Sequence, residues 1–428
     1  MAKLNDEYED IFSDSSFTEQ SIKKKNRKKN SAVKFVIFGC IIALLGGGVG
    51  FAALSGVFEP QSVPTESSDV SKAKEEKTQE SSEEEEEVSE ESEGVSYNTT
   101  LQFKSDLNRF SKTVKKLLDQ EITSEFVVLY DLTEDRVLYN KNGNKKCYPA
   151  STTKLMTAVV SSKILSKDTV ITVGDEIHMI DPESTTAGLE EGMQLTYEMM
   201  LDAMLLPSGN DAAYTLAVNS ARVYKEDDTL SNEEAIKVFA QLMNEAAEQL
   251  GCKGSHFTAP DGIHDDDHYT TAEDLTRIAA YARSLPLVMN SCKKNHAEWE
   301  LISNGHESSD EEEEESEVSV GDNDSENLNI DSPLGFEYSD TVEWDNTNAM
   351  IIPDSGQYSK FADGMKTGFT DQAGTCVVSS ATISGHTIIA TVMNATTIYQ
   401  KYHEANKLFE VGFKLYDMDY THQDDYLE

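Results

Sequence analysis

The chain has 428 residues, of which 78 are Asp or Glu and 36 are Lys or Arg, so its net charge at pH 7 is −42. This length is enough for one large domain or two ordinary ones. Such acidity argues against a nucleic-acid partner, because phosphate binding needs clustered Lys and Arg. Two segments, 59–94 and roughly 307–326, hold much of the charge, so the acidity belongs to segments more than to a fold.

The N-terminal region predicts a membrane anchor. Residues 1–34 are polar and are expected to form a cytoplasmic tail, and residues 35–58 carry no charge. At ~1.5 Å per residue the uncharged run can cross a hydrocarbon core of ~30 Å. The basic cluster at 23–29 orients the N-terminus to the cytoplasm and the rest of the chain outside. A cleaved signal peptide, with Ala53 and Ser55 near the cleavage site, is the alternative, but the long run and leader favour a retained anchor.

Residues 59–97 are rich in Glu and Ser and predict a disordered acidic linker, because too little apolar surface is present to offset the chain entropy. A folded domain is predicted over 98–420, with an acidic insertion at about 305–330. The stretch "DNDSEN" from Asp322 resembles the start of a calcium loop but lacks a glycine at its sixth position, so a solvated acidic loop is favoured.

The domain is expected to open with a helical stretch from residue 98 to about residue 120. Two apolar runs flank a polar turn in "EFVVLYDLTEDRVLYN", which is typical of a β-hairpin. The helix that begins near Ser151 is apolar almost all round, as in a helix buried in a core. An apolar helical run follows at 199–206.

Further along, Ser231 and Glu234 form a capping box for a helix that is expected to stop at Gly251. Two strands are predicted in "TCVVSSATISGHTIIATVMNA", around 384–385, and a final helix with one apolar stripe follows. Strands at both ends with helices between them predict an α/β domain whose terminal segments share one sheet.

The cysteines show no CxxC spacing, so a zinc ribbon or a thioredoxin-like motif is not expected. Their pattern favours small buried hydrophobes, although disulfides are possible outside the cell. They are Cys40, Cys147, Cys252, Cys292 and Cys376.

Three short fragments carry candidate chemistry. Ser151 and Lys154 lie three positions apart in "PASTTKLMTA", so a helix places them on one face. A serine is a poor nucleophile unless a neighbour takes its proton, and a buried lysine is pushed toward the neutral form that can do so. Taken alone, this spacing is common, with Ser as a helix cap and Lys on the surface.

The second fragment is "LLPSGNDAA", in which Ser208 and Asn210 follow an apolar run and can relay a proton and hold a substrate amide. The third is "DGMKTGFTDQAGTC", in which Lys366 and Thr367 can hold a carboxylate and Gly368 lets an extended peptide approach the edge of a strand. Each is commonplace alone.

In this order, the three fragments resemble the signature of penicillin-binding proteins and serine β-lactamases. The chain is most similar to the D-alanyl-D-alanine carboxypeptidases of low molecular mass, and the likeness extends over about residues 98–415. It is carried by "YPASTTKLMTA", "GLEEGMQLTYEMMLDAMLLPSGNDAA", "FTAPDGIHDDDHYTTAEDL" and "GMKTGFTDQAGTCVVSSA". The resemblance implies an antiparallel sheet flanked by helices.

The resemblance also implies roles for individual residues. Ser151 would be the acylated nucleophile, Lys154 its general base and Ser208 part of the proton relay to the leaving group. The substrate would contact Asn210, and its terminal carboxylate Lys366 and Thr367. The main-chain N–H groups of Ser151 and Phe369, beside Gly368, would form the oxyanion hole.

The implied substrate is the D-Ala-D-Ala end of a peptidoglycan stem peptide, the implied inhibitors are β-lactams, and no metal or cofactor is implied. With the anchor, this predicts a single-pass protein of the cell membrane, with its catalytic domain outside, in a Gram-positive bacterium. The chain departs from the family in its acidic insertion and at Ala349 and Met350, where the family often has a basic and an apolar residue.

Two other functions stay open. A β-lactamase is disfavoured because class A enzymes use Ser-Asp-Asn where this chain has Ser-Gly-Asn. The other is a catalytically weak sensor or scaffold that binds wall peptides or β-lactams. The stretch "HDDDH" at 264–268 resembles a metal cluster, but the family has a similar loop without metal, so a structural loop is favoured.

Overall fold

A computed structural model describes residues 94–105, 112–305 and 341–423. Its main sheet has six strands in the order β1-β3-β2-β11-β10-β9. Neighbouring strands are antiparallel except β1 and β3, which are parallel. The strands are β1 (Lys104–Ser105), β2 (Phe126–Asp131), β3 (Arg136–Lys141), β9 (Ala362–Thr370), β10 (Gly374–Ile383) and β11 (His386–Ala395).

The α/β domain with its shared terminal sheet is therefore confirmed, as are the hairpin β2–β3 and the strand pair β10–β11. The central strand β2 is buried at every position. Strands covered on both faces appear as continuous apolar runs rather than alternating patterns, which explains why "FVVLY" carries no polar residue in its middle.

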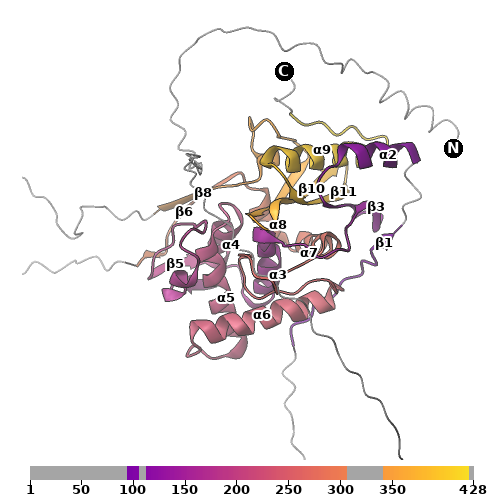
Figure 1. The fold of residues 1–428 in the computed structure, drawn as a ribbon. Helices are drawn as coiled ribbons and strands as arrows, with labels where there is room; N and C mark the ends of the chain where they lie inside the picture. Colours follow the sequence, from indigo (N-terminus) through magenta and orange to yellow (C-terminus); the bar gives the residue numbers. More distant parts are fainter. Residues whose placement is uncertain (1–93, 106–111, 306–340, 424–428) are drawn as a thin grey trace, which may run out of the picture. The chain divides into compact units, whose positions relative to one another are not determined.

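Helices cover both faces of the sheet (Figure 1). Helices α3, α7 and α8 contact one face, whereas α9 contacts β2, β10 and β11 from the other. Helices α4, α5 and α6 form a second region around α3. The bounds are α2 (Lys112–Glu121), α3 (Lys154–Ile164), α4 (Tyr197–Leu205), α5 (Asn210–Lys225), α6 (Asn232–Gln249), α7 (Ala272–Arg283), α8 (Pro286–Lys293) and α9 (Ile398–Lys414).

Two smaller sheets complete the described part of the fold. One has the order β4-β5-β7, and the other pairs β6 with β8. Their bounds are β4 (Val170–Thr172), β5 (Met193–Thr196), β6 (His296–Glu300), β7 (Ser303–Asn304) and β8 (Thr341–Asp345).

The helix predicted from residue 98 is wrong in its first part. Residues 94–103 form no helix, and α2 begins at Lys112. Tertiary contacts hold the earlier segment extended: the main-chain N–H of Tyr97 donates to Gln249, and Phe103 stacks on Tyr130 with ring centroids 4.5 Å apart. These contacts outweigh a weak local helix propensity.

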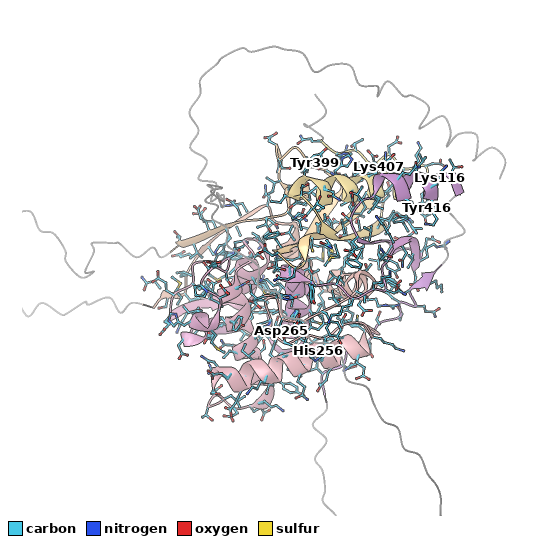
Figure 2. All side chains as sticks on the ribbon, viewed as in Figure 1. Lys116, His256, Asp265, Tyr399, Lys407 and Tyr416 are labelled. Atoms are coloured by element: carbon cyan, nitrogen blue, oxygen red, sulfur yellow. The ribbon has the colours of Figure 1, made fainter. Side chains whose placement is uncertain are left out.

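Helix α2 lies against α9 at the upper edge of the domain. The ammonium group of Lys407, on α9, pairs with the carboxylate of Glu121, the last residue of α2, at 3.5 Å. Figure 2 labels Lys407 on α9 and Lys116 on α2. The capping box at Ser231 is confirmed, because its side chain accepts from the N–H of Glu234 and the Glu234 carboxylate accepts from Ser231.

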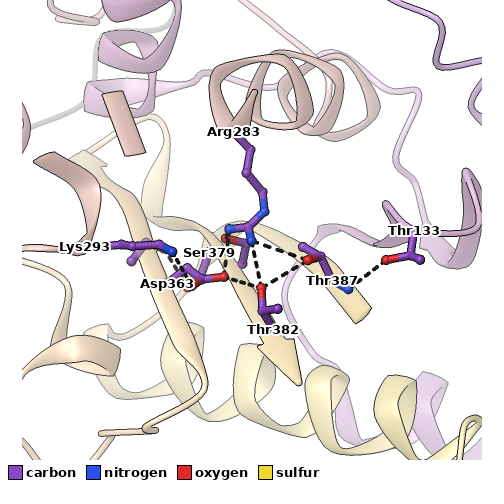
Figure 3. Close-up of polar contacts among 9 residues, drawn as sticks. Thr133, Arg283, Lys293, Asp363, Ser379, Thr382 and Thr387 are labelled. Atoms are coloured by element: carbon purple, nitrogen blue, oxygen red, sulfur yellow. Dashed lines mark hydrogen bonds and ion pairs between the residues drawn. The ribbon is translucent and has the colours of Figure 1, made fainter. Parts of the chain in front are cut away.

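A network of ion pairs and hydroxyl groups fixes the start of β9 (Figure 3). The carboxylate of Asp363 accepts from Arg283 of α7 at 2.7 Å and from Lys293 of α8 at 3.1 Å. Arg283 also donates to the hydroxyl of Thr382 at 2.7 Å, and that hydroxyl donates to Asp363 at 2.6 Å. The strand that carries Lys366 is thus bonded to two helices and to β10.

The four cysteines in the described part of the chain, Cys147, Cys252, Cys292 and Cys376, are buried and unpaired, which confirms their assignment as small buried residues. Among the described helices, none combines the length and apolar character needed to span a bilayer. The predicted tail, the membrane segment, most of the linker and most of the acidic insertion lie outside the described residues. The linker predicted over 59–97 is wrong at its end, because Tyr97 is buried and its main-chain N–H is bonded to Gln249.

Candidate active site

The turn before α3 brings Ser151 and Lys154 together. Pro149 precedes a 3-10 turn, η2 (Ala150–Thr153), which runs directly into α3. Ala150 has a φ of 48°, a left-handed value that side chains seldom adopt, so the turn is strained where it presents the serine. The Nζ atom of Lys154 lies 3.0 Å from the Oγ atom of Ser151.

Lys154 is fully buried, and three oxygen atoms surround its amine. Besides Ser151, it donates to Oδ1 of Asn210 at 2.6 Å and to the carbonyl of Asp261 at 3.1 Å. Burial lowers the pKa of Lys154 to about 8, although the nearby carboxylates of Asp261 and Asp211 oppose that shift. An amine with this pKa can exist in the neutral form near pH 7, as a general base requires.

Asp261 and Gly262 form the wall behind this amine. Burial raises the pKa of the Asp261 carboxyl, and the neighbouring Lys154 ammonium partly offsets that rise. Gly262 has a φ of 89°, and a Cβ atom there would lie 1.9 Å from the carbonyl oxygen of Ala150. Glycine is therefore required for this loop to reach the η2 turn.

Ser208 and Asn210 lie at the start of α5, on a turn as predicted. Ser208 has a left-handed φ of 72°, and its hydroxyl makes no hydrogen bond to the described residues. Asn210 begins the helix, and its N–H donates to the carbonyl of Thr185 at 2.8 Å. The Asp211 carboxylate then accepts from the N–H of Ala187 at 2.8 Å, so the loop before β5 is fixed to this turn.

Lys366, Thr367 and Gly368 of the third fragment lie inside the edge strand β9, and the end of the fragment forms the start of β10. Gly368 faces the nucleophile: a Cβ atom there would lie 3.0 Å from the main-chain nitrogen of Ser151. Phe369, the next residue, has a side chain that is 62% exposed. Gly368 thus permits the main chain of β9 to lie against the η2 turn.

Lys366 and Thr367 are both buried beside this contact. Lys366 donates to the carbonyl of Thr367 at 3.1 Å. Burial lowers the pKa of Lys366 well below its usual range, and the ammonium groups of Lys154 and Lys401 lower it further. Because the charge of Lys154 affects the pKa of Lys366, the two ammonium groups are close enough to repel each other. An anion bound between them would reduce this repulsion.

All predicted site residues therefore come from three segments that meet around the η2 turn. Direct bonds join Lys154 to Ser151 and Asn210, and Gly368 packs on Ser151. No hydrogen bond in the described residues joins Ser208 or Lys366 to Ser151. Sequence reasoning missed Asp261, whose carbonyl contacts Lys154 from 107 positions away.

The loop at 264–268 supports the η2 turn through its last histidine. The N–H of Thr258 lies 3.2 Å from Nδ1 of His268, so the other ring nitrogen carries the proton and donates to Oγ1 of Thr153 at 2.9 Å. Burial lowers the pKa of His268 to about 4. On the exposed side of this loop, Nδ1 of His256, which Figure 2 labels, lies 2.6 Å from the main-chain carbonyl oxygen of Asp267.

Within the residues that the structure describes, no three His, Cys, Asp or Glu side chains are arranged to hold a metal ion. A buried lysine beside a serine, an amide and a glycine-lined strand edge, on a sheet covered by helices, defines the class of penicillin-binding proteins and serine β-lactamases.

More narrowly, the chain belongs to the D-alanyl-D-alanine carboxypeptidase family, peptidase family S11, a family of serine hydrolases, whose model matches residues 111–311 and 316–397. It is 30% identical over 285 residues to a D-alanyl-D-alanine carboxypeptidase of Streptomyces sp. (strain K15), covering 65% of this chain and 83% of that protein. It is 27% identical over 295 residues to the D-alanyl-D-alanine carboxypeptidase DacF of Bacillus subtilis (strain 168), covering 68% of this chain and 62% of that protein.

Among solved structures, the Streptomyces K15 DD-transpeptidase is similar, with a TM-score of 0.54 and 27% identity over 68% of this chain and 98% of that one. The chain spans only about 62% of the length of the Bacillus relative.

Proposed function

We propose that this protein is a membrane-anchored D-alanyl-D-alanine carboxypeptidase that removes the terminal D-alanine from peptidoglycan stem peptides through an acyl-serine intermediate. The observation that carries the proposal is the 3.0 Å contact between the buried amine of Lys154 and the hydroxyl of Ser151. The family membership supports the substrate class.

In the proposed reaction, the Oγ atom of Ser151 attacks the carbonyl carbon between the two D-alanines, and its proton passes to the neutral amine of Lys154. With a pKa of about 8, about one-tenth of the amine is neutral at pH 7. The N–H groups of Ser151 and Phe369 would stabilise the oxyanion, because Gly368 holds β9 against the η2 turn.

Collapse of the tetrahedral intermediate breaks the peptide bond, and the departing amine of D-alanine takes up the proton that Lys154 accepted from Ser151. Ser208, whose hydroxyl is free of partners in the described residues, is the proposed relay for that proton. Water then hydrolyses the acyl-serine, with Lys154 again accepting a proton. Asn210 would hold the substrate amide, and Lys366 with Thr367 would hold the terminal carboxylate, which offsets the crowded positive charge at Lys366.

The proposed location is the outer face of the cell membrane of a Gram-positive bacterium. The uncharged run at 35–58 would be the single membrane span, and the basic cluster at 23–29 would orient it. β-Lactams would act as inhibitors, since they would acylate the same serine.

The test is to incubate the purified full-length protein with a labelled penicillin and with a D-Ala-D-Ala peptide. We expect a stable adduct on the peptide that contains Ser151, located by mass spectrometry, and release of D-alanine. The Ser151→Ala variant should show neither. Rapid turnover of the penicillin would instead identify a β-lactamase, and a stable adduct without D-alanine release would identify a binding protein.

A further inference from the structure

The proposed function uses Thr367 to hold a carboxylate, and a residue outside the three motifs contacts it. The hydroxyl oxygen of Thr367 lies 2.7 Å from the hydroxyl oxygen of Thr347. Thr367 is buried, whereas Thr347 is exposed. Thr347 follows strand β8, and Thr367 lies in β9. The two threonines are 20 positions apart in the sequence, so only the tertiary fold brings their hydroxyl groups together.

The loop around Thr347 is held by two buried asparagines on either side of it. The side-chain amide of Asn346 donates to the carbonyl of Lys294 at 2.8 Å, and its Oδ1 atom accepts from the N–H of Asn348 at 2.9 Å. The Oδ1 atom of Asn348 accepts from the N–H of Met350 at 3.1 Å. Because the main chain is fixed on both sides of Thr347, its exposed side chain is held in one orientation.

The main chain of Thr347 joins further parts of the site. Its N–H donates to the carbonyl of Leu206 at 3.1 Å, at the end of α4 and two residues before Ser208. Its carbonyl accepts from the hydroxyl of Tyr402, on α9, at 2.8 Å. Thr347 is thus bonded to the turn that carries Ser208, to strand β9 and to α9.

We propose that Thr347 is a positioning residue that directs the hydroxyl proton of Thr367 toward the terminal carboxylate of the substrate. This inference rests on the proposed function. A carboxylate oxygen can only accept, so Thr367 must donate to it. Thr347 in turn donates to Thr367, and two hydroxyls in series that end on an anion polarise one another and bind it more strongly than one hydroxyl alone.

Two variants separate the effect of the Thr347 hydroxyl from the effect of the side chain's shape. Thr347→Val keeps the branched side chain and removes the hydroxyl, and Thr347→Ser keeps the hydroxyl. The matched control is Thr229→Val, because Thr229 is also exposed and its hydroxyl also makes a hydrogen bond, to Asp227 at 2.6 Å, in the loop between α5 and α6. Tyr402→Phe removes the bond to the Thr347 carbonyl, together with a hydrogen bond between the Tyr402 hydroxyl and the main chain of Ala349.

Each full-length variant is assayed on two substrates: an acyl-D-Ala-D-Ala peptide and the same peptide with a C-terminal amide. For Thr347→Val we expect about a tenfold loss of kcat/KM on the carboxylate substrate, mainly as a higher KM, since hydrogen bonds to charged groups are among the stronger ones. The loss on the amide substrate should be several-fold smaller. Thr347→Ser should restore the wild-type preference, Tyr402→Phe should lose part of it, and Thr229→Val should leave it unchanged.

Equal losses on both substrates for Thr347→Val, or no loss on either, would overturn the inference while the proposed function stands. Failure of Thr347→Ser to restore the preference would also overturn it. A wild-type protein that releases no D-alanine and binds no penicillin would contradict the proposed function itself, and the inference would fall with it.

Discussion

The amine of Lys154 donates a hydrogen bond of 2.6 Å to Oδ1 of Asn210, and this bond joins the helix that follows the nucleophile to helix α5. The amide accepts from the amine without adding charge, so burial still dominates and the pKa of Lys154 stays near 8. A charge introduced at Asn210 should therefore change the pH at which Lys154 becomes neutral and can activate Ser151.

The first prediction concerns the pH dependence of acylation. Since only the neutral amine can accept a proton, the rate of penicillin acylation should rise with pH to a plateau, with a midpoint near 8. Asn210→Asp places a carboxylate beside the ammonium and should move the midpoint upward by more than about one pH unit. Asn219→Asp, on the same helix, is the control. An unchanged midpoint for Asn210→Asp would exclude Lys154 as the titrating base.

The second prediction concerns stability. The folded-state pKa of Lys154 is lowered from 10.5 to about 8, so the folded protein binds fewer protons than the unfolded chain between these values. The cost of burying the charge is present in full below pH 8 and disappears as pH rises toward 10.5. Relative to Lys154→Met, the wild type should therefore gain about 2 to 3 kcal/mol in free energy of unfolding between pH 7 and pH 10.5.

Urea unfolding at both pH values measures this difference. The variant lacks the titrating amine, so the pH dependence common to both proteins cancels. A constant gap between the two proteins would mean that Lys154 titrates normally.

The third prediction tests the contact behind the η2 turn. Gly262→Ala adds a methyl group 1.9 Å from the carbonyl oxygen of Ala150, at a φ of 89°. Gly188 has a similar φ of 78° but nothing within 4 Å of an added Cβ, so Gly188→Ala measures the backbone strain alone. We expect about 1 kcal/mol of destabilisation for Gly188→Ala and at least about 3 kcal/mol for Gly262→Ala, from urea unfolding. Equal effects would show that the loop can move away from the turn.

The fourth prediction uses His268, whose folded-state pKa is lowered from 6.5 to about 4. Its contribution to stability is complete above pH 6.5 and is lost as pH falls toward 4, because the unfolded chain takes up the proton first. His268→Gln removes this titration, so the loss of stability between pH 7 and pH 5 should be about 2 kcal/mol smaller than in the wild type. An equal loss of stability in the two proteins between pH 7 and pH 5 would show that His268 is not its source.

Much of the fold was predictable because its signals are local. Apolar runs in "FVVLY" and "TIIATVM" become buried strands, and Ser231 with Glu234 caps α6, since both patterns act within a few residues. The spacing of Ser151 and Lys154 was equally readable, because three residues of helix bring the two side chains to one face.

Other features depend on residues that are distant in sequence, and no local pattern marks them. The carbonyl of Asp261 holds the amine of Lys154, and the hydroxyl of Thr347 meets that of Thr367. A main-chain carbonyl or a lone threonine carries no recognisable motif. The helix predicted from residue 98 fails over residues 98–103 for a related reason, because contacts with distant segments, such as the stacking of Phe103 on Tyr130, override local propensity.

The chemistry of the site divides in the same way. The order of the residues along the chain supplies a nucleophile, an amine and a carboxylate clamp as residue types. Whether the amine is neutral depends on the complete removal of water around Lys154, which distant segments produce together when they pack. Desolvation is a property of the packed interior, so only the folded molecule can lower that pKa.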